Sequence, residues 1–432
     1  MPESLYTRRM IPRGLKDFLP KDAARKRAVE NALATTFARW GYAEVITPTV
    51  EFFECLALGD GPELVEKMYR LFDREGHQLA LRPEVTTPIG RIVATRLKDE
   101  PMPQRLYYLA NVFRYEEPQA GRQREFWQAG VELVGATGPA ADAEVIALAV
   151  TALAAAGLKD FRLDIGQVGY GNGLMEGVAL SADDRRAIRK ALLRRDYVAL
   201  EEILERTGLP QDKRRLLREL PRLRGREEAI VRALELADNP TSRQAAENLG
   251  ELYAALAAHG VADRVYIDFG MIKDLDYYTG MVLEGYVPDL GFPVCTGGRY
   301  DNLIARFGYE CPATGFVVGV ERLMMALEGQ GALPGSEPAP RWLVGSDHAG
   351  RPRALSAARH MRERGWTVEV DVLERPLDAL LEYARARGVP YLAYYDGDAR
   401  LQVFAAPGYT ALDAAGMAGL GDVAELFGGD AP

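Results

Sequence analysis

Residues 105–133 hold the feature that most restricts the fold of this chain, a pair of strands around a polar loop. Apolar and aromatic residues at 106–110, continued at 111–115, predict the first strand, and residues 126–133 predict the second. Polar and charged residues occupy the loop at 116–124. Helical patterns precede and follow this pair, so the expected fold combines strands with helices.

Length and composition indicate the class of protein. The 432 residues suffice for two or three domains, and 48% apolar with 27% charged residues is usual for a soluble globular protein. No apolar segment typical of a secretory signal opens the chain, and no stretch approaches about 18 uninterrupted apolar residues. We therefore expect a cytoplasmic protein without a membrane segment. The scattered cysteines and isolated histidines predict neither a metal site nor a cofactor.

The chain divides into a large first part and a small second part. Residues 329–340 have the composition of a linker between 1–328 and 341–432. Alternating strands and helices after the linker predict a small α/β domain with a mostly parallel sheet. Before it, we expect helices at 21–40, at 140–156 and over a helical insertion at about 180–258, and further strands at 44–50, 161–165, 265–269 and 279–287.

Arginine-rich runs within the helical insertion have two interpretations. The runs at 185–195 and 214–226 could form a face for RNA. Acidic residues interleave with them throughout, which is typical of solvated helix faces. The net charge of −9 also argues against a protein whose main task is to hold a polyanion. We therefore expect no nucleic-acid partner.

The run from Phe113 to Glu132 carries the residues with the clearest chemistry. An arginine such as Arg114, on a strand inside a pocket, can hold a phosphate through two N–H donors. A neighbouring acid such as Glu116 can accept from the amino group of adenine. These residue types suit an ATP site, whereas Arg114 taken alone would fit a solvent-facing hairpin equally well.

Three further segments contain candidate binding residues. Residues 81–88 include Glu84, whose carboxylate can accept from an ammonium group, although an ordinary surface acid would look the same. Residues 295–301 include a glycine pair that lets another group approach the backbone closely. Residues 315–323 predict a strand that turns into a helix carrying Arg322.

Together these segments resemble the histidyl group of class II aminoacyl-tRNA synthetases. The run at 113–132 is similar to motif 2 of those enzymes, and residues 315–323 are similar to motif 3. The helix and strand at 21–50 resemble motif 1, which forms the dimer interface of the family. The resemblance implies an α+β fold with an antiparallel core sheet and helices, and a C-terminal domain like an anticodon-binding domain.

The same resemblance implies a pocket for histidine. A carboxylate and a phenol hydroxyl that face the two ring nitrogens would reject other amino acids, because buried partners would stay unpaired. The residues it places in this histidine-binding pocket are Glu84 and Gln128 at the ammonium and carboxylate end, Glu132, Tyr277 and Tyr278 around the imidazole, and Thr86.

One departure from the family lies at residues 271–278, Met-Ile-Lys-Asp-Leu-Asp-Tyr-Tyr. The family has Arg-Gly where this chain has Lys273 and Asp274, and its arginine contacts the α-phosphate and the carboxylate while the two react. Lysine lacks the planar fork that holds two oxygens at once. Donors of that kind are worth roughly 3–4 kcal/mol in a transition state. We therefore interpret Arg114, Glu116, Lys273 and Arg322 as the remnant of a phosphate site.

These departures resemble one branch of the family, the regulatory subunits of ATP phosphoribosyltransferase. The segments at 111–126, 138–149 and 297–303 are similar to that branch, whose members lack aminoacylation activity. They assemble with a short catalytic subunit that joins ATP to phosphoribosyl pyrophosphate in the first step of histidine synthesis. The resemblance implies a non-catalytic subunit, a homodimer within a larger hetero-oligomer, with histidine as its feedback effector. Many members lack a domain like residues 341–432.

Two other functions remain compatible with the sequence. Arg114, Glu116 and Arg322 favour an active histidyl-tRNA synthetase, because histidine sensing alone does not explain them. An RNA-binding module would fit the synthetase ancestry. However, residues 341–432 hold ten arginines and no lysine against thirteen acids, a composition that suits an anticodon-binding domain poorly.

Overall fold

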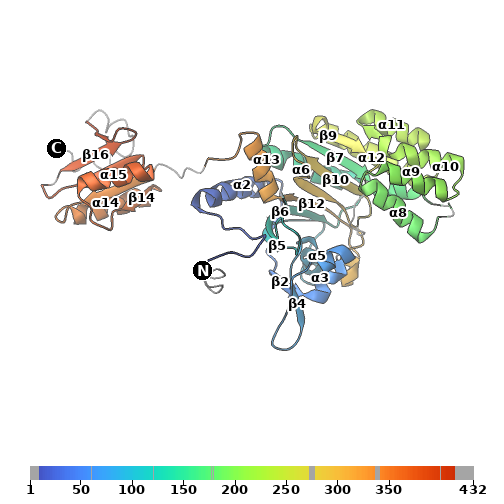
Figure 1. Ribbon diagram of the computed structural model, residues 1–432, viewed down its shortest axis with the longest axis horizontal. Coiled ribbons are helices and arrows are strands. Elements are labelled where there is room, and N and C mark those ends of the chain that lie inside the picture. Colours follow the sequence, from blue (N-terminus) through green and yellow to red (C-terminus); the bar gives the residue numbers. More distant parts are fainter. Residues whose placement is uncertain are drawn as a thin grey trace. The chain divides into compact units, whose positions relative to one another are not determined.

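The computed structural model describes residues 9–413 except 60, 120, 177, 179, 272–277, 336–340 and 399. The chain forms two compact units, Met1–Gly335 and Ser336–Pro432 (Figure 1). Within the described part of the chain, no helix has the length and apolarity needed to cross a bilayer.

The centre of the first unit is a large sheet. Among the described residues it has nine strands in the order β1-β5-β6-β12-β11-β10-β7-β9-β8. Neighbours are antiparallel except for the parallel pairs β1–β5 and β7–β9, which confirms the expected fold class. In chain order the strands are β1 (Ala43–Glu44), β5 (Gln104–Phe113), β6 (Glu125–Val134), β7 (Arg162–Gln167), β8 (Arg224–Gly225), β9 (Val265–Asp268), β10 (Met281–Tyr286), β11 (Cys295–Arg299) and β12 (Ala313–Gly319).

Both faces of this sheet are covered. In β5, alternate residues such as Tyr108 and Val112 are buried against α5 (Thr86–Thr95) and the short 3-10 helix η3 (Ile304–Phe307). The opposite face packs on apolar side chains of other helices, which form the larger core. Those helices are α2 (Pro20–Arg39), α6 (Pro139–Ala155), α12 (Pro240–Ala258) and α13 (Val320–Gly329), of which Figure 1 shows α2, α6 and α13 on the side of the sheet away from α5.

The expected strand at 44–50 is wrong in its extent. β1 ends at Glu44, and the next strand, β2 (Val50–Phe52), belongs to a separate sheet with β3 (Arg70–Phe72) and β4 (Gln78–Leu81). Pro48 has no N–H to donate to a strand ladder. The guanidinium of buried Arg82 donates hydrogen bonds to the carbonyl oxygens of Thr47 and Pro48, at 2.7 and 3.3 Å. This contact holds the chain out of either sheet, and α3 (Phe53–Gly59) and α4 (Pro62–Glu66) follow.

The segment from α8 (Ala182–Leu193) to α12 consists mainly of helices. Three of its helices have a side-chain N-cap. Ser181, Asp196 and Asn239 each accept a backbone N–H from the first turn of the helix that follows. A buried seam that includes Ile188, Leu192, Leu204 and Leu217 joins these helices to the larger core. After α7 (Val168–Leu174) the helices are α8 (Ala182–Leu193), α9 (Tyr197–Arg206), α10 (Gln211–Glu219), the 3-10 helix η1 (Leu220–Arg222), α11 (Glu227–Leu236) and α12; the 3-10 helix η2 (Ala262–Arg264) precedes β9.

The second unit has a sheet in the order β14-β13-β15-β16-β17. The first three strands are parallel, as expected, while the last two add antiparallel pairs that the sequence analysis did not predict. Buried Trp342 belongs to one core and Leu343 to another on the opposite face, as strand alternation requires. The elements are β13 (Arg341–Ser346), α14 (Arg351–Glu363), β14 (Thr367–Val370), α15 (Leu377–Arg387), β15 (Tyr391–Tyr395), β16 (Leu401–Ala405) and β17 (Thr410–Ala411).

Candidate ligand-binding site

The central strands of the large sheet position most of the predicted histidine-binding residues. Gln128 and Glu132 lie on β6, four residues apart, where strand alternation directs them to the same face. Thr86 is the first residue of α5, and its hydroxyl donates to Glu132 Oε1 at 2.8 Å. Tyr278 packs against the core that α5, β5 and η3 form, which we call the α5 core. Tyr277 and Lys273 lie outside the described residues.

Glu132 is a buried carboxyl group, with only 2% of its surface exposed. Burial raises its pKa to about 8, and the charge of Glu84 adds to this, while hydrogen bonds from Tyr300 and Thr86 oppose the rise. The hydroxyl of Tyr300 donates to Oε2. At neutral pH the free protein therefore holds a neutral carboxyl here, ready to share its proton with a ring nitrogen.

Gly315 makes room for that carboxyl. The two residues face each other across the β6–β12 pairing, and a Cβ on Gly315 would lie 2.0 Å from Glu132 Oε2. An added methyl group would therefore displace the carboxyl. The glycine in the predicted strand-to-helix segment thus has a packing role that the sequence analysis did not assign.

Glu84 and Gln128 are also buried. Glu84 Oε1 accepts the backbone N–H of Thr87 at 2.8 Å, and burial raises the pKa of Glu84 while that bond and others to Thr86 oppose the rise. Gln128 Oε1 is buried without a hydrogen-bond partner among the described residues. Buried acceptors are nearly always paired in native proteins. The ammonium group of an amino acid would supply the donor that this oxygen lacks.

The three described residues of the phosphate-site remnant line one cavity of about 310 Å³. Arg114 donates from Nε to the carbonyl of Pro83 at 2.9 Å, and Arg322 donates from Nε to the carbonyl of Gly121 at the same distance. Burial lowers the pKa of Arg322, and the positive charges of Arg114 and Arg122 lower it further. Cations that repel one another in a half-buried cavity are arranged to accept an anion. We call this space the Arg322 cavity.

Arg114 and Glu116 also line a second cavity, of about 680 Å³. Tyr278 lines this second space, together with several residues of α8. We call it the α8 cavity. Gln128 lines the Arg322 cavity, whereas Glu84, Thr86 and Glu132 line neither of the two. The structure therefore does not place the predicted histidine residues in one open space.

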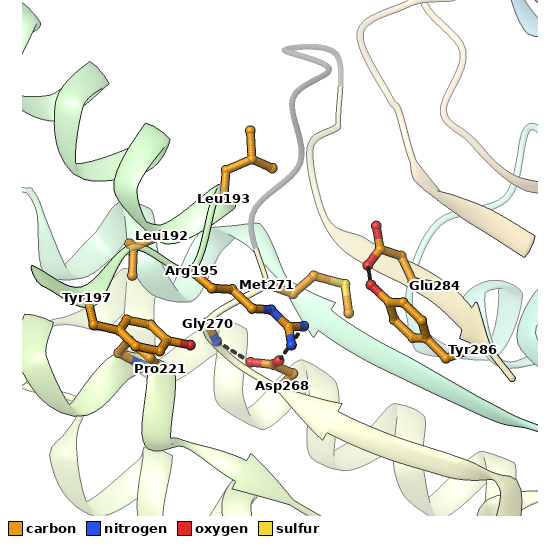
Figure 2. Close-up of a pocket in the computed structure, with 10 residues that line it drawn as sticks. All are labelled: Leu192, Leu193, Arg195, Tyr197, Pro221, Asp268, Gly270, Met271, Glu284 and Tyr286. Atoms are coloured by element: carbon orange, nitrogen blue, oxygen red, sulfur yellow. Dashed lines mark hydrogen bonds and ion pairs between the residues drawn. The ribbon is translucent and has the colours of Figure 1, made fainter. Parts of the chain in front are cut away.

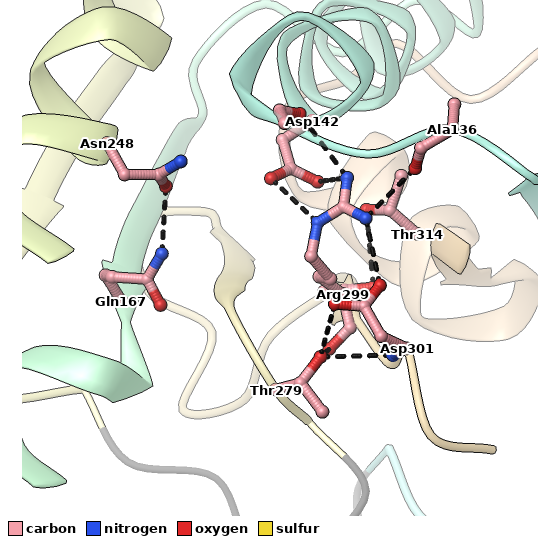
Figure 3. Close-up of polar contacts among 10 residues, drawn as sticks. Ala136, Asp142, Gln167, Asn248, Thr279, Arg299, Asp301 and Thr314 are labelled. Atoms are coloured by element: carbon pink, nitrogen blue, oxygen red, sulfur yellow. Dashed lines mark hydrogen bonds and ion pairs between the residues drawn. The ribbon is translucent and has the colours of Figure 1, made fainter. Parts of the chain in front are cut away.

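Buried Arg299 is the centre of an ionic network (Figure 3). Arg299 donates to both carboxylate oxygens of Asp142, at 2.8 and 3.1 Å, and to Asp301 at 3.0 Å. Asp301 in turn accepts from the hydroxyl of Thr279, the residue after Tyr278. Sequence reasoning missed this network and missed Tyr300. The available signal was the pair of charged residues directly after the glycine pair, and Asp142 at the start of an alanine-rich helix.

A smaller cavity of about 130 Å³ lies where the insertion meets the large sheet (Figure 2). Asp268, at the end of β9, accepts the N–H of Gly270 at 2.9 Å and pairs with Arg224 at 3.1 Å. Arg195, which follows α8, also pairs with Asp268, at 3.9 Å. These contacts fix the C-terminal end of α8 to the sheet.

One group among the described residues has the ligand atoms for a metal ion. Asp73, Glu75 and His77 lie in the turn between β3 and β4, with those atoms within 4.8 Å of one another. The His77 ring and the Asp73 carboxylate form a hydrogen bond of 2.8 Å. Two of the three residues are exposed, so a local turn contact explains the group.

Comparison with known proteins first defines the class. A family model described as histidyl-tRNA synthetase matches residues 14–323. The crystal structure of histidyl-tRNA synthetase from a Nostoc species has a TM-score of 0.81 at 21% identity, over 97% of this chain and 98% of that chain. That likeness concerns the fold alone. The fold and the matched residues thus define a protein of the histidyl-tRNA synthetase-like class.

Closer relatives narrow the class. An ATP phosphoribosyltransferase regulatory subunit from Moorella thermoacetica is 46% identical over 382 residues, which cover 88% of this chain and 96% of that protein. The crystal structure of an ATP phosphoribosyltransferase regulatory subunit/histidyl-tRNA synthetase from Bacillus halodurans has a TM-score of 0.78 at 33% identity, over 90% of this chain and 97% of that chain. The chain belongs to the family of ATP phosphoribosyltransferase regulatory subunits, which confirms the predicted branch.

Proposed function

We propose that this protein is the regulatory subunit that a short ATP phosphoribosyltransferase catalytic subunit needs for activity, and that histidine acts through it as feedback inhibitor. The observation that carries the proposal is 46% identity to a regulatory subunit over nearly the whole of both chains. Buried Glu132 adds chemical support, because a neutral carboxyl beside a tyrosine hydroxyl suits an imidazole ring. The assembly is a homodimer within a larger hetero-oligomer in the cytoplasm.

Histidine binds around Arg114 in this proposal. Its ring shares a proton with Glu132, and Tyr278 closes the ring side together with Tyr277, which lies outside the described residues. Its ammonium group donates to the unpartnered oxygen of Gln128, with Glu84 close by as a second acceptor. Feedback requires that histidine bind one arrangement of the assembly more tightly than the other.

The protein is non-catalytic in this proposal. Lys273 and Asp274 replace the Arg-Gly pair of the synthetase motif, which removes the fork that grips the reacting groups. The runner-up function is an active histidyl-tRNA synthetase. The observation in its favour is that Arg114, Glu116 and Arg322 still line the Arg322 cavity.

Two assays on the purified protein separate these functions. A regulatory subunit switches on a short ATP phosphoribosyltransferase catalytic subunit and gives no histidine-dependent exchange of pyrophosphate into ATP. A synthetase gives robust exchange and charges transfer RNA, and that result would refute the proposal.

The histidine site has its own test. We expect Glu132→Ala to weaken histidine inhibition by at least tenfold without dissolving the complex, because the ring loses its proton partner. Glu247→Ala, at an exposed position on α12, is the matched control and should leave inhibition unchanged. Equal inhibition in both variants would place the sensor elsewhere in the molecule.

A further inference from the structure

The α8 cavity is lined by an unusual set of charged side chains. Among the residues that the structure describes, six cations and two carboxylates line it, in a space of about 680 Å³. That volume is typical of sites that take a small molecule. The cations are Lys67, Arg114, Arg186, Arg189, Lys190 and Arg194, and the carboxylates are Glu63 and Glu116.

Four of these cations come from one face of α8 and its C-terminal end. Arg186, Arg189, Lys190 and Arg194 are spaced by three, one and four residues, and positions three and four apart lie on the same side of a helix. Ile188 and Leu192 point the other way into the larger core. The arginine-rich run that could be either an RNA face or a solvated helix face therefore lines a cavity.

Contacts at both ends of α8 hold its cationic face toward the cavity. At its N-terminal end, the hydroxyl of Ser181 accepts the N–H of Asp184 at 3.0 Å, and Arg185 donates to the carbonyls of Met175 and Val178 at 2.5 and 3.1 Å. At its other end, Arg195 pairs with Asp268, as Figure 2 shows. Both ends of α8 are thus fixed to neighbouring structure.

Among the described residues, the acids that pair with these cations neutralise only part of their charge. Lys67 pairs with Glu116 at 3.1 Å, and Arg186 pairs with exposed Asp183 at 2.8 Å. Arg189 donates to Asn172, which is uncharged. Uncompensated cations gathered in one cavity repel one another and attract a ligand with several negative charges.

We propose that the α8 cavity binds a small molecule that carries a pyrophosphate group, either free or as part of a nucleotide. Lys190 and Arg194 contact the phosphates in this site, and Arg114 and Tyr278 line the same cavity. A cavity of this size suits one small ligand. RNA binding requires a longer basic track, and the chain as a whole has a net charge of −9.

The site would give the regulator a second input, and this consequence rests on the proposed function. ATP is named in the activity of the relatives, so the catalytic partner handles molecules with linked phosphates. Tyr278 is a predicted histidine residue that lines the α8 cavity, and Arg114 lines both this cavity and the Arg322 cavity. Linkage is reciprocal, so a pyrophosphate ligand that changes histidine affinity is itself bound more or less tightly by the same factor when histidine is present.

Isothermal titration of the isolated full-length protein with inorganic pyrophosphate and with ATP tests the site. We expect the double variant Lys190→Glu/Arg194→Glu to weaken binding of at least one of these probes by tenfold or more. Both side chains are exposed, so the exchange leaves the packing of α8 intact, which circular dichroism can verify. Tighter binding of ATP would identify a nucleotide ligand, and tighter binding of pyrophosphate would identify the free group.

Two controls make the result specific. Arg215→Glu reverses an exposed charge on α10 outside the cavity and should change affinity by less than twofold. Arg322→Ala removes a cation of the Arg322 cavity and so reports phosphate binding there; weaker binding in Lys190→Glu/Arg194→Glu but not in Arg322→Ala assigns the ligand to the α8 cavity. Loss of binding in Arg322→Ala alone, or binding of a single-stranded RNA oligonucleotide but neither probe, would overturn the proposal. None of these measurements needs the catalytic partner, so failure here is distinct from failure of the proposed function.

Discussion

The carboxyl group of Glu132 lies in the interior, with the hydroxyls of Thr86 and Tyr300 as its hydrogen-bond partners. Because its pKa is raised to about 8, the folded protein holds a proton there that the unfolded chain would release near pH 4.5. The stability that this group contributes is fully present below its unfolded pKa and is lost as pH rises through its folded pKa. An imidazole ring bound to Glu132 changes the pH at which this carboxyl releases its proton.

We expect histidine affinity to be greatest between about pH 6.5 and pH 8. In this range Glu132 is protonated and the free histidine ring is neutral, since the pKa of imidazole is about 6.5. The ring and the carboxyl then share one proton and exchange none with solvent. Affinity falls at lower pH, where the ring must lose a proton, and at higher pH, where Glu132 must gain one. Calorimetric titrations across this range measure the profile, and a flat profile would contradict the shared proton.

The buried ion pair between Arg299 and Asp142 leads to a stability prediction. We expect Arg299→Met to lower the free energy of unfolding by roughly 3–5 kcal/mol, because it leaves a buried carboxylate without its partner. The loss should shrink at low pH, where Asp142 takes up a proton more readily because burial raises its pKa. Urea denaturation measures both effects. The double variant Arg299→Met/Asp142→Leu should regain part of the loss, and no recovery would argue against the pair as the cause.

At the residue scale, the sequence could predict which side chains form the candidate site better than which of them contact one another. Glu132 and Thr86 were both expected near histidine, and the structure joins them directly. Tyr300 was missed because its hydroxyl reaches Glu132 across 168 positions of sequence, a pairing that only the folded sheet creates. Arg299 was missed for the same reason, since its partner Asp142 lies on a distant helix.

At the scale of elements, periodic patterns predicted helices and central strands well. The helix expected at 140–156 is α6, and the strand expected at 126–133 is β6. The prediction failed where a distant side chain decides the backbone path, as Arg82 does between β1 and β2. It also missed β16 and β17, whose antiparallel pairing depends on an existing sheet edge.

The cap of α12 leads to a prediction for the insertion. Asn239 accepts the N–H of Ser242 at 2.8 Å, so we expect Asn239→Ala to destabilise α12 by about 1 kcal/mol. Hydrogen exchange in the first turn of α12 should speed up accordingly, because local opening becomes easier. Asn239→Ser keeps an acceptor at this position and should restore most of the protection. Equal exchange in all three proteins would show that packing alone holds the helix end.

At the scale of the whole molecule, each unit has its own core. The larger core and the α5 core lie within the first unit, and the two cores around Trp342 and Leu343 lie within the second. The division at Gly335 falls within the glycine- and proline-rich segment that the sequence marks as a linker. Composition could indicate this boundary because few packed contacts form across a linker between two domains, so polar and flexible residues are tolerated there.

We expect a chain ending at Gly335 to fold and to bind histidine with affinity within twofold of the full-length protein. Every described histidine candidate lies in the first unit, and Glu84, Thr86 and Glu132 have hydrogen-bond partners there as well. Calorimetry on the two proteins makes the comparison. A tenfold or larger loss of affinity, with circular dichroism unchanged, would mean that the second unit contributes to the histidine site.

Because Arg114 lines both the Arg322 cavity and the α8 cavity, one synthetic molecule could be designed to enter both. Joining an amino-acid mimic to an acidic arm through a short tether makes the second contact intramolecular, which raises overall avidity without stronger individual contacts. Such a compound would bind selectively to proteins that keep both cavities. A histidine analogue without the acidic arm would not distinguish these proteins from others.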